Sequence, residues 1–159
     1  MGTRQSRRVL VSVLVGLLSA SLAGSYIYAL QFNGFVYIGE TQRNPVARWS
    51  QHLIGSGSFV EALAKRDVVL SSEDGVYFLA FRCDVEKAGV LPVARRIFTQ
   101  AVEHELHCLF ASRRTCAKVI SDTVRTCPPV AFFTVAVREI AETMFGQLER
   151  LLDTGSPND

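Results

Sequence analysis

Two tyrosines, an arginine and a histidine are the residues of this chain whose types and spacing could support chemistry. Tyr26 and Tyr37 are eleven positions apart, on two apolar runs, and Arg48 and His52 follow them four positions apart. A four-residue step places Arg48 and His52 on one face of a helix. The planar guanidinium group suits bidentate binding of phosphate, and a histidine can shuttle a proton.

The elements that must position these residues can be read from turn and cap signals. Asn33-Gly34 separates the two apolar runs, which predicts a β-hairpin with strands over residues 25–31 and 35–39. Pro45 precedes a predicted helix over residues 46–53. Ser58 is expected to cap a second helix over residues 59–66, with Glu61 completing a capping box.

These features resemble the GIY-YIG nuclease family. The first motif reads Gly24-Ser25-Tyr26 here and the second reads Tyr37-Ile38-Gly39. Roughly residues 24–112 carry the resemblance. It implies an α/β fold, a small GIY-YIG-like sandwich in which helices flank a central, mainly antiparallel three-stranded sheet, and we expect a C-terminal helix in addition.

The resemblance also implies roles for single residues. In the family the second tyrosine, here Tyr37, is close to the attacking water and is argued to be its general base, whereas the first, here Tyr26, hydrogen-bonds in the same site. Arg48 matches the arginine that contacts the scissile phosphate, with Arg43 as a competitor for substrate binding. His52 would support Arg48 or shuttle a proton.

A single glutamate on the helix after the third strand holds the metal in that family. Glu103 aligns best with it, while Glu105 is two positions away and faces elsewhere on the helix. One carboxylate and several waters suit Mg²⁺ or Mn²⁺. We expect no small-molecule cofactor.

The expected function is therefore that of a divalent-metal-dependent DNA endonuclease. A catalytically inactive module that binds nucleic acid or protein on the same fold is the alternative, and a chance motif in an exported α/β protein is a third. The chain departs from the family pattern at Ser25, which replaces an aliphatic residue, and at Glu40, which follows Gly39. The late asparagine of the family has no counterpart between Pro45 and Pro157.

Composition allows one domain and gives little support to nucleic-acid binding. The 159 residues are 48% apolar and carry a formal charge of +2. Three of the 17 basic residues precede an apolar N-terminal tract, which leaves 14 against 15 acidic residues. Affinity for DNA would therefore need local clustering of basic side chains.

The N-terminal segment, residues 1–23, has a basic start, an apolar stretch from Val9, and Ser21-Leu22-Ala23 as a candidate cleavage site. A signal peptide, a membrane anchor and a packed element all fit it. A DNA substrate favours a cytoplasmic protein, and a protein anchored or exported through residues 1–23 is the alternative.

The rest of the chain is read as a domain over residues 24–112, a helical extension over 113–152 and a polar tail over 153–159. Residues 76–83 predict a third strand at the centre of the sheet, and residues 92–113 predict a long helix. The last helix, residues 130–152, is amphipathic, so it should pack on the domain or form a homodimer.

Four cysteines without a C-x-x-C pair are expected to be ordinary buried thiols. A zinc site at His104 and Cys108, with Cys116, is the less favoured interpretation because it lacks ligands.

Overall fold

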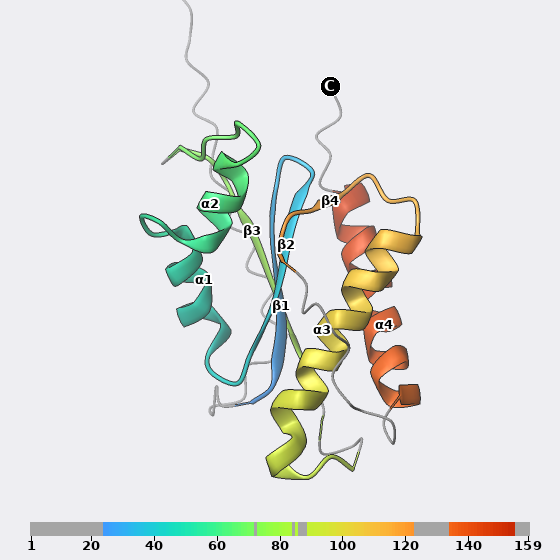
Figure 1. The fold of residues 1–159 in the computed structure, drawn as a ribbon. Helices are drawn as coiled ribbons and strands as arrows, with labels where there is room; N and C mark the ends of the chain where they lie inside the picture. The colour runs from blue at the N-terminus through green and yellow to red at the C-terminus, as the bar shows by residue number, and fades with distance from the viewer. Residues whose placement is uncertain (1–23, 72, 84, 86–88, 123–133, 155–159) are drawn as a thin grey trace, which may run out of the picture.

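The computed structural model describes residues 24–71, 73–83, 85, 89–122 and 134–154. A single sheet lies between two layers of helices (Figure 1). The strands are ordered β3-β1-β2-β4, and their bounds are β1 Tyr26–Phe32, β2 Phe35–Thr41, β3 Tyr77–Arg82 and β4 Lys118–Val119.

The helices follow the predicted order with small shifts of their ends. Helices α1 (Pro45–Leu53) and α2 (Ser58–Ala64) cover one face of the sheet, and α3 (Arg95–Ser112) and α4 (Thr134–Thr154) cover the other (Figure 1). The predicted helix over 92–113 starts as a short 3₁₀ turn, η1 (Pro92–Ala94), before α3.

The predicted hairpin is confirmed. Phe32 pairs with Phe35, and the two loop residues Asn33 and Gly34 have φ angles of 48° and 78°. Positive φ at both central residues is the geometry of the two-residue turn that matches strand twist. This turn fixes the register of the whole hairpin.

Two expectations about the sheet are wrong. The inner strands of the sheet are β1 and β2, and β3 lies at an edge. The sheet is mixed and four-stranded, because β4 pairs in parallel with β2. The apolar character of β3 has another cause. Phe78 stacks on Trp49 of α1 at 5.5 Å between ring centroids, whereas Leu79 and Phe81 pack against the core on the other face.

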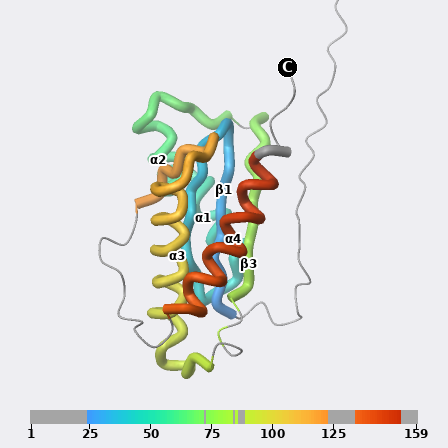
Figure 2. Tube along the Cα trace, turned by 90° about the vertical axis from the view of Figure 1, so that its right-hand side faces the viewer, coloured from blue at the N-terminus to red at the C-terminus, as the bar shows by residue number. Residues whose placement is uncertain are grey.

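The alternation of side chains along β1 and β2 divides the core in two. Ile27, Ala29 and Ile38 face α3 and α4 in the larger cluster of buried side chains. Leu30 belongs to the smaller cluster, with Phe59 of α2. Figure 2 shows α3 and α4 lying side by side over the strands.

Helix α4 packs on the domain of its own chain. This is one of the two predicted alternatives, the other being a homodimer. Val137, Ala141, Phe145 and Leu148 are buried in the larger cluster, and the Phe145 ring meets Phe110 of α3 edge-on at 4.8 Å. Residues 130–133 of the predicted helix lie outside the described part of the chain. The homodimer stays a prediction.

No helix within the described ranges is long and apolar enough to cross a membrane. The predictions for residues 1–23 fall on a segment outside those ranges.

Candidate active site

Tyr28 of β1 lies opposite Gly39 of β2 in the hairpin register. A Cβ atom at position 39 would overlap the Tyr28 hydroxyl group, so the phenol ring passes directly over this glycine. Only glycine leaves the space for so close an approach. The glycine of the Tyr37-Ile38-Gly39 motif thus lets the Tyr28 side chain cross β2 and reach α1.

His52 of α1 meets the Tyr28 side chain. Its Nε2 atom is 2.6 Å from Tyr28 Oη, and its Nδ1 atom is 2.5 Å from Oγ of Ser58, the first residue of α2. A Cβ atom at Gly57 would overlap the backbone carbonyl group of His52. This close packing brings Ser58 to the ring, and His52 is only 5% exposed.

Ser58 joins His52 to the motif tyrosine Tyr37. The Tyr37 hydroxyl group donates to Ser58 Oγ at 3.1 Å, and the rings of Tyr37 and His52 are 4.9 Å apart. The prediction that Ser58 caps α2 is wrong, because Gly57 holds the N-cap position and makes no side-chain cap bond. The Ser58 hydroxyl group belongs instead to a continuous chain from Tyr28 through His52 and Ser58 to Tyr37.

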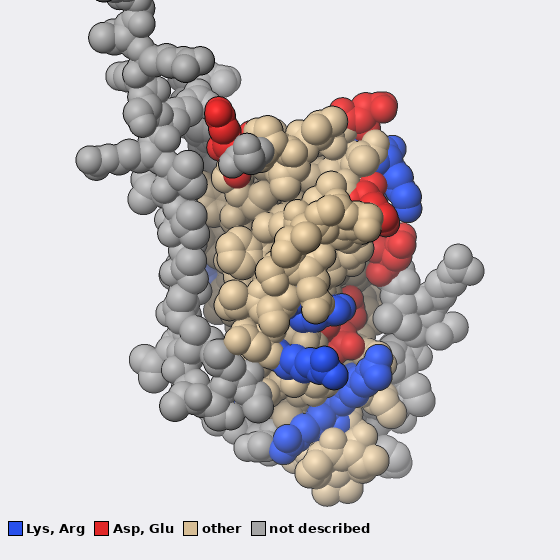
Figure 3. All heavy atoms as spheres, turned by 90° about the vertical axis from the view of Figure 1, so that its left-hand side faces the viewer, with Lys and Arg blue, Asp and Glu red and all other residues tan. Residues whose placement is uncertain are grey.

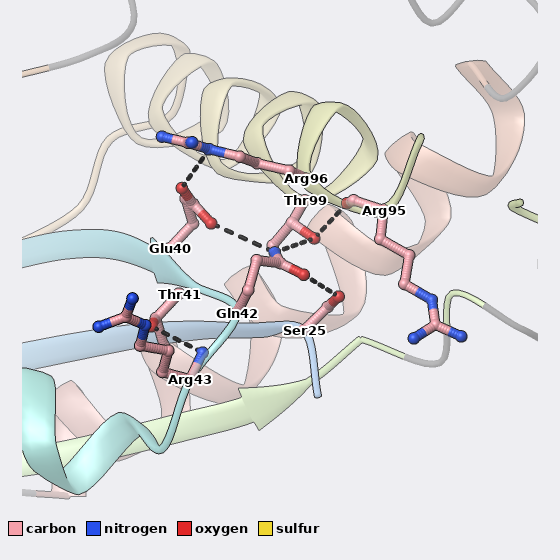
Figure 4. A network of polar contacts seen from close by, with 8 residues as sticks. All are labelled: Ser25, Glu40, Thr41, Gln42, Arg43, Arg95, Arg96 and Thr99. Carbon is pink, nitrogen blue, oxygen red and sulfur yellow. Dashed lines mark hydrogen bonds and ion pairs between the residues drawn. The ribbon is translucent and has the colours of Figure 1, made fainter. Parts of the chain in front are cut away.

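Arg48 lies one turn before His52 on α1, as predicted. Its guanidinium group is close enough to the Tyr28 hydroxyl group to lower the pKa of the phenol, and its Nη1 atom donates to Gln51 Oε1 at 3.0 Å. Arg43 is exposed in the loop before α1, where its backbone N–H group donates to Thr41 Oγ1 at 3.1 Å (Figure 4). The structure therefore brings Arg48 to the tyrosine site and leaves Arg43 on its surface.

Burial determines the protonation states of this group. It lowers the pKa of His52 to about 4, with a smaller contribution from the Arg48 cation, so the imidazole is neutral at pH 7. Burial first, and then Tyr37, raise the pKa of the Tyr28 phenol, although Arg48 acts in the opposite direction. A neutral imidazole has one donor and one acceptor nitrogen, and both have partners here.

Glu103 lies on α3, in the helical layer on the other face of the sheet from α1 and α2 (Figure 1). It is 8% exposed, and burial, followed by the charge of Glu40, raises its pKa to about 7. Its charge also acts on Tyr28. Within the described residues, the Glu103 carboxylate makes no hydrogen bond or ion pair. Glu105 is less buried than Glu103.

Tyr26 is buried on the same strand face as Tyr28, at the end of β1, where it pairs in register with Thr41 and Arg82. Sequence reasoning selected Tyr26 by its distance from Tyr37 and missed Tyr28 and Ser58. A signal for Tyr28 was present, because a two-residue turn at Asn33-Gly34 pairs position 28 with position 39.

The donors at this site suit a hard divalent cation. Glu103 is 8% exposed as a residue, and its carboxylate has no cationic partner among the described residues; a negative charge held in such a place is costly unless a proton or a metal ion compensates it. The part of the chain that the structure describes contains no group of three or more His, Cys, Asp and Glu side chains that could hold a metal. One carboxylate with several waters is a ligand set that Mg²⁺ or Mn²⁺ accepts. His104, Cys108 and Cys116, the residues of the zinc alternative, form no such group within the described ranges.

The expectation of buried thiols holds for Cys83 and is wrong for Cys108 and Cys116, which are exposed. Cys127 lies outside the described residues.

The face of the molecule formed by α1 and α2 carries acidic side chains over its upper part and basic side chains over its lower part (Figure 3). Figure 3 shows that face of the molecule, with Lys and Arg side chains gathered over its lower part and an acidic side chain among them. Local clustering is what a chain of such small net charge needs to attract a nucleic-acid backbone.

Comparison of the chain with models of protein families, with curated proteins and with solved structures found no match.

Proposed function

We propose that the protein is a divalent-metal-dependent DNA endonuclease that hydrolyses phosphodiester bonds. The observation that carries this proposal is the group formed by Tyr28, Tyr37, Arg48 and His52, together with a buried carboxylate, Glu103, whose charge acts on Tyr28. Two phenols, a guanidinium group, a neutral imidazole and a buried carboxylate come from β1, β2, α1 and α3; they belong to Tyr28, Tyr37, Arg48, His52 and Glu103.

Substrate binding is assigned to Arg48 and to the metal held by Glu103. The guanidinium fork of Arg48 would bind two oxygens of the scissile phosphate, a geometry that lysine cannot reproduce. The cation would supply Lewis acidity toward the phosphoryl oxygen. Tyr28 replaces Tyr26 in this proposal as the first tyrosine, and its raised pKa keeps the phenol protonated, so that it donates a hydrogen bond.

Activation of water is assigned to Tyr37, Ser58 and His52. Tyr37 donates to Ser58, and Ser58 can donate to Nδ1 of the neutral His52 ring. Transfer of both protons toward His52 leaves a phenolate on Tyr37 that accepts a proton from the attacking water. The negative phosphodiester would offset the Arg48 charge that lowers the pKa of His52, which makes His52 a better proton acceptor once substrate is bound.

The bonds balance in one displacement. The water oxygen forms a bond to phosphorus as the bond from phosphorus to the leaving oxygen breaks. The proton of the water passes to Tyr37, the leaving oxygen takes a proton from solvent, and His52 releases to solvent the proton that it received, which restores the starting state.

The test is cleavage of plasmid, branched and single-stranded DNA by the full chain with Mg²⁺ or Mn²⁺. We expect nicking of at least one substrate, and EDTA should abolish it. Glu103→Gln should remove cleavage and keep DNA binding, whereas the matched control Glu105→Gln on the same helix should cleave normally.

If the protein cleaves none of the three substrates but still binds DNA, the nuclease proposal is wrong and the inactive binding module is the better interpretation. Cleavage by Glu103→Gln together with its loss in Glu105→Gln would instead move the metal ligand to Glu105.

A further inference from the structure

A second carboxylate, that of Glu40, acts on Glu103 through its charge. Glu40 follows the Tyr37-Ile38-Gly39 motif on β2, and its charge is close enough to Glu103 to act on that carboxyl group. Its side chain is 15% exposed. Two carboxylates that are largely removed from water and act on each other repel, and a shared proton or a shared cation relieves the repulsion.

The side chains around Glu40 hold it against α3. Arg96 Nε is 3.9 Å from Glu40 Oε1, and Gln42 Nε2 donates to Glu40 Oε2 at 3.4 Å. Gln42 also donates to Thr99 Oγ1 at 3.1 Å and accepts from Ser25 Oγ at 2.7 Å. Figure 4 shows Glu40 pointing toward the first turns of α3 within this network.

The positions of its partners on α3 relate Glu40 to Glu103. Arg96, Thr99 and Glu103 are three and four residues apart, so they form one stripe of the helix. Arg96 and Thr99 belong to the network of Glu40, and Glu103 continues the same stripe by one turn. The stripe therefore lies along β2, with the two carboxylates at neighbouring levels.

The contacts to Glu40 orient its carboxylate without saturating it. A carboxylate has about four lone-pair sites, and the two contacts of 3.9 and 3.4 Å are both longer than an ordinary charged hydrogen bond. The Arg96 side chain is 73% exposed, so this ion pair is weak in water. Oxygen sites remain for a cation, and Glu103 supplies a buried carboxylate without a partner among the described residues.

We propose that Glu40 is a second oxygen ligand of the divalent cation that Glu103 would bind, so that one carboxylate from β2 and one from α3 share the ion. Mg²⁺ is commonly bound through one or two carboxylates, with waters completing its shell. The inference rests on the metal assigned to Glu103 under the proposed function. It explains why this chain places an acid directly after the motif glycine, where it would otherwise only repel substrate.

The test is Mn²⁺ binding by the full chain without DNA, measured by calorimetry and by the electron paramagnetic resonance signal of free Mn²⁺. Glu40→Gln should weaken binding by at least about tenfold, and Glu103→Gln should weaken it at least as much. Glu105→Gln, which removes the same charge from another position of α3, should bind within about twofold of the wild type.

Arg96→Met separates ligation from a purely structural role of Glu40. It breaks the same ion pair but keeps the Glu40 carboxylate, so Mn²⁺ binding should be retained or tightened by the loss of a nearby positive charge. Equal weakening in Arg96→Met and Glu40→Gln would show that the network positions α3, and the inference would fail. Thermal melting of each variant confirms that it is folded.

The remaining outcomes separate this inference from the proposed function. If Glu40→Gln binds Mn²⁺ with wild-type affinity and only Glu103→Gln loses binding, Glu40 is not a ligand, and the proposed nuclease function is unaffected. Absence of Mn²⁺ binding by the wild type overturns the second ligand as well. Weakened Mn²⁺ binding in Glu40→Gln, in a protein that cleaves no DNA, supports the two-carboxylate site and overturns the nuclease.

Discussion

The Tyr28 hydroxyl group occupies the space that a side chain at position 39 would need. The two residues are register partners in the hairpin, and the hydroxyl group is 2.6 Å from His52 Nε2. The small size of Gly39 is therefore a condition for contact between the central strand and α1.

Gly39→Ala should displace the Tyr28 ring and separate it from His52. We expect a loss of stability of about 1–3 kcal/mol, the usual cost of overpacking a buried site, together with strongly reduced cleavage. Gly75→Ala is the control, because nothing lies within 4 Å of a Cβ atom at that position. Urea unfolding and DNA cleavage of both variants are the measurements. Equal stability of the two variants would contradict the close approach.

Tyr28→Phe and Tyr26→Phe identify which tyrosine of β1 serves the site. Tyr28→Phe removes the hydroxyl group that contacts His52 and Arg48, so cleavage should fall by about 100-fold or more. The cleavage rate of Tyr26→Phe should stay within about threefold of the wild-type rate, because this change leaves the contact between Tyr28 and His52 intact. Single-turnover cleavage rates decide between them, and the reverse order would restore Tyr26 to the role that its spacing predicts.

Ser58→Ala interrupts the proton path between Tyr37 and His52. We expect kcat to fall by about 100-fold with little change in KM, because general base catalysis is lost while phosphate binding is kept. Stability should change little, since Ser58 makes no cap bond. The matched control is Ser50→Ala, whose exposed hydroxyl group bonds only its own helix. A rise in KM at constant kcat would point to substrate binding by Ser58.

Glu103 should make the metal-free protein less stable as the pH rises. Its pKa is about 7 in the folded state against 4.5 ordinarily, so the folded state binds the proton more tightly. The stabilisation is complete below pH 4.5 and is lost as the pH passes through 7, by up to roughly 3 kcal/mol.

His52 and His107 have folded pKa values of about 4, so they act with the opposite sign, destabilising the fold as the pH falls below 6.5. The difference between the wild type and Glu103→Gln isolates the glutamate. Denaturant unfolding between pH 4.5 and 8 should show this difference changing with pH, and a constant difference would refute the raised pKa.

The sequence predicted the hairpin and α1 well because their signals are local. A two-residue Asn-Gly turn sets its own geometry, and Pro45 with the Asn44 side chain, which accepts from the Val46 N–H group at 2.9 Å, fixes the start of α1. The four-residue step from Arg48 to His52 then places both side chains without tertiary information.

The sheet order and the carboxylate pair were not predictable in this way. The position of β3 depends on which strands pair over long distances, and its apolar run fits an edge strand once Trp49 and α4 cover its two faces. Glu40 seemed a liability beside a phosphate site. Its relation to Glu103 depends on the packing of α3 against β2, which spacing along the chain does not encode.

Because the core is divided into two unequal clusters, the helices that carry the candidate site and the helices of the other layer should differ in the free energy of local opening. Helices α1 and α2 are held mainly by the smaller cluster, which includes Leu30, Phe59 and Leu63. Helices α3 and α4 share the larger one. Local opening requires less free energy where fewer apolar contacts are lost. We therefore expect α1 and α2 to exchange amide protons sooner than α3, so that the protein would lose Arg48 and His52 from the candidate site while the rest of the molecule is still native.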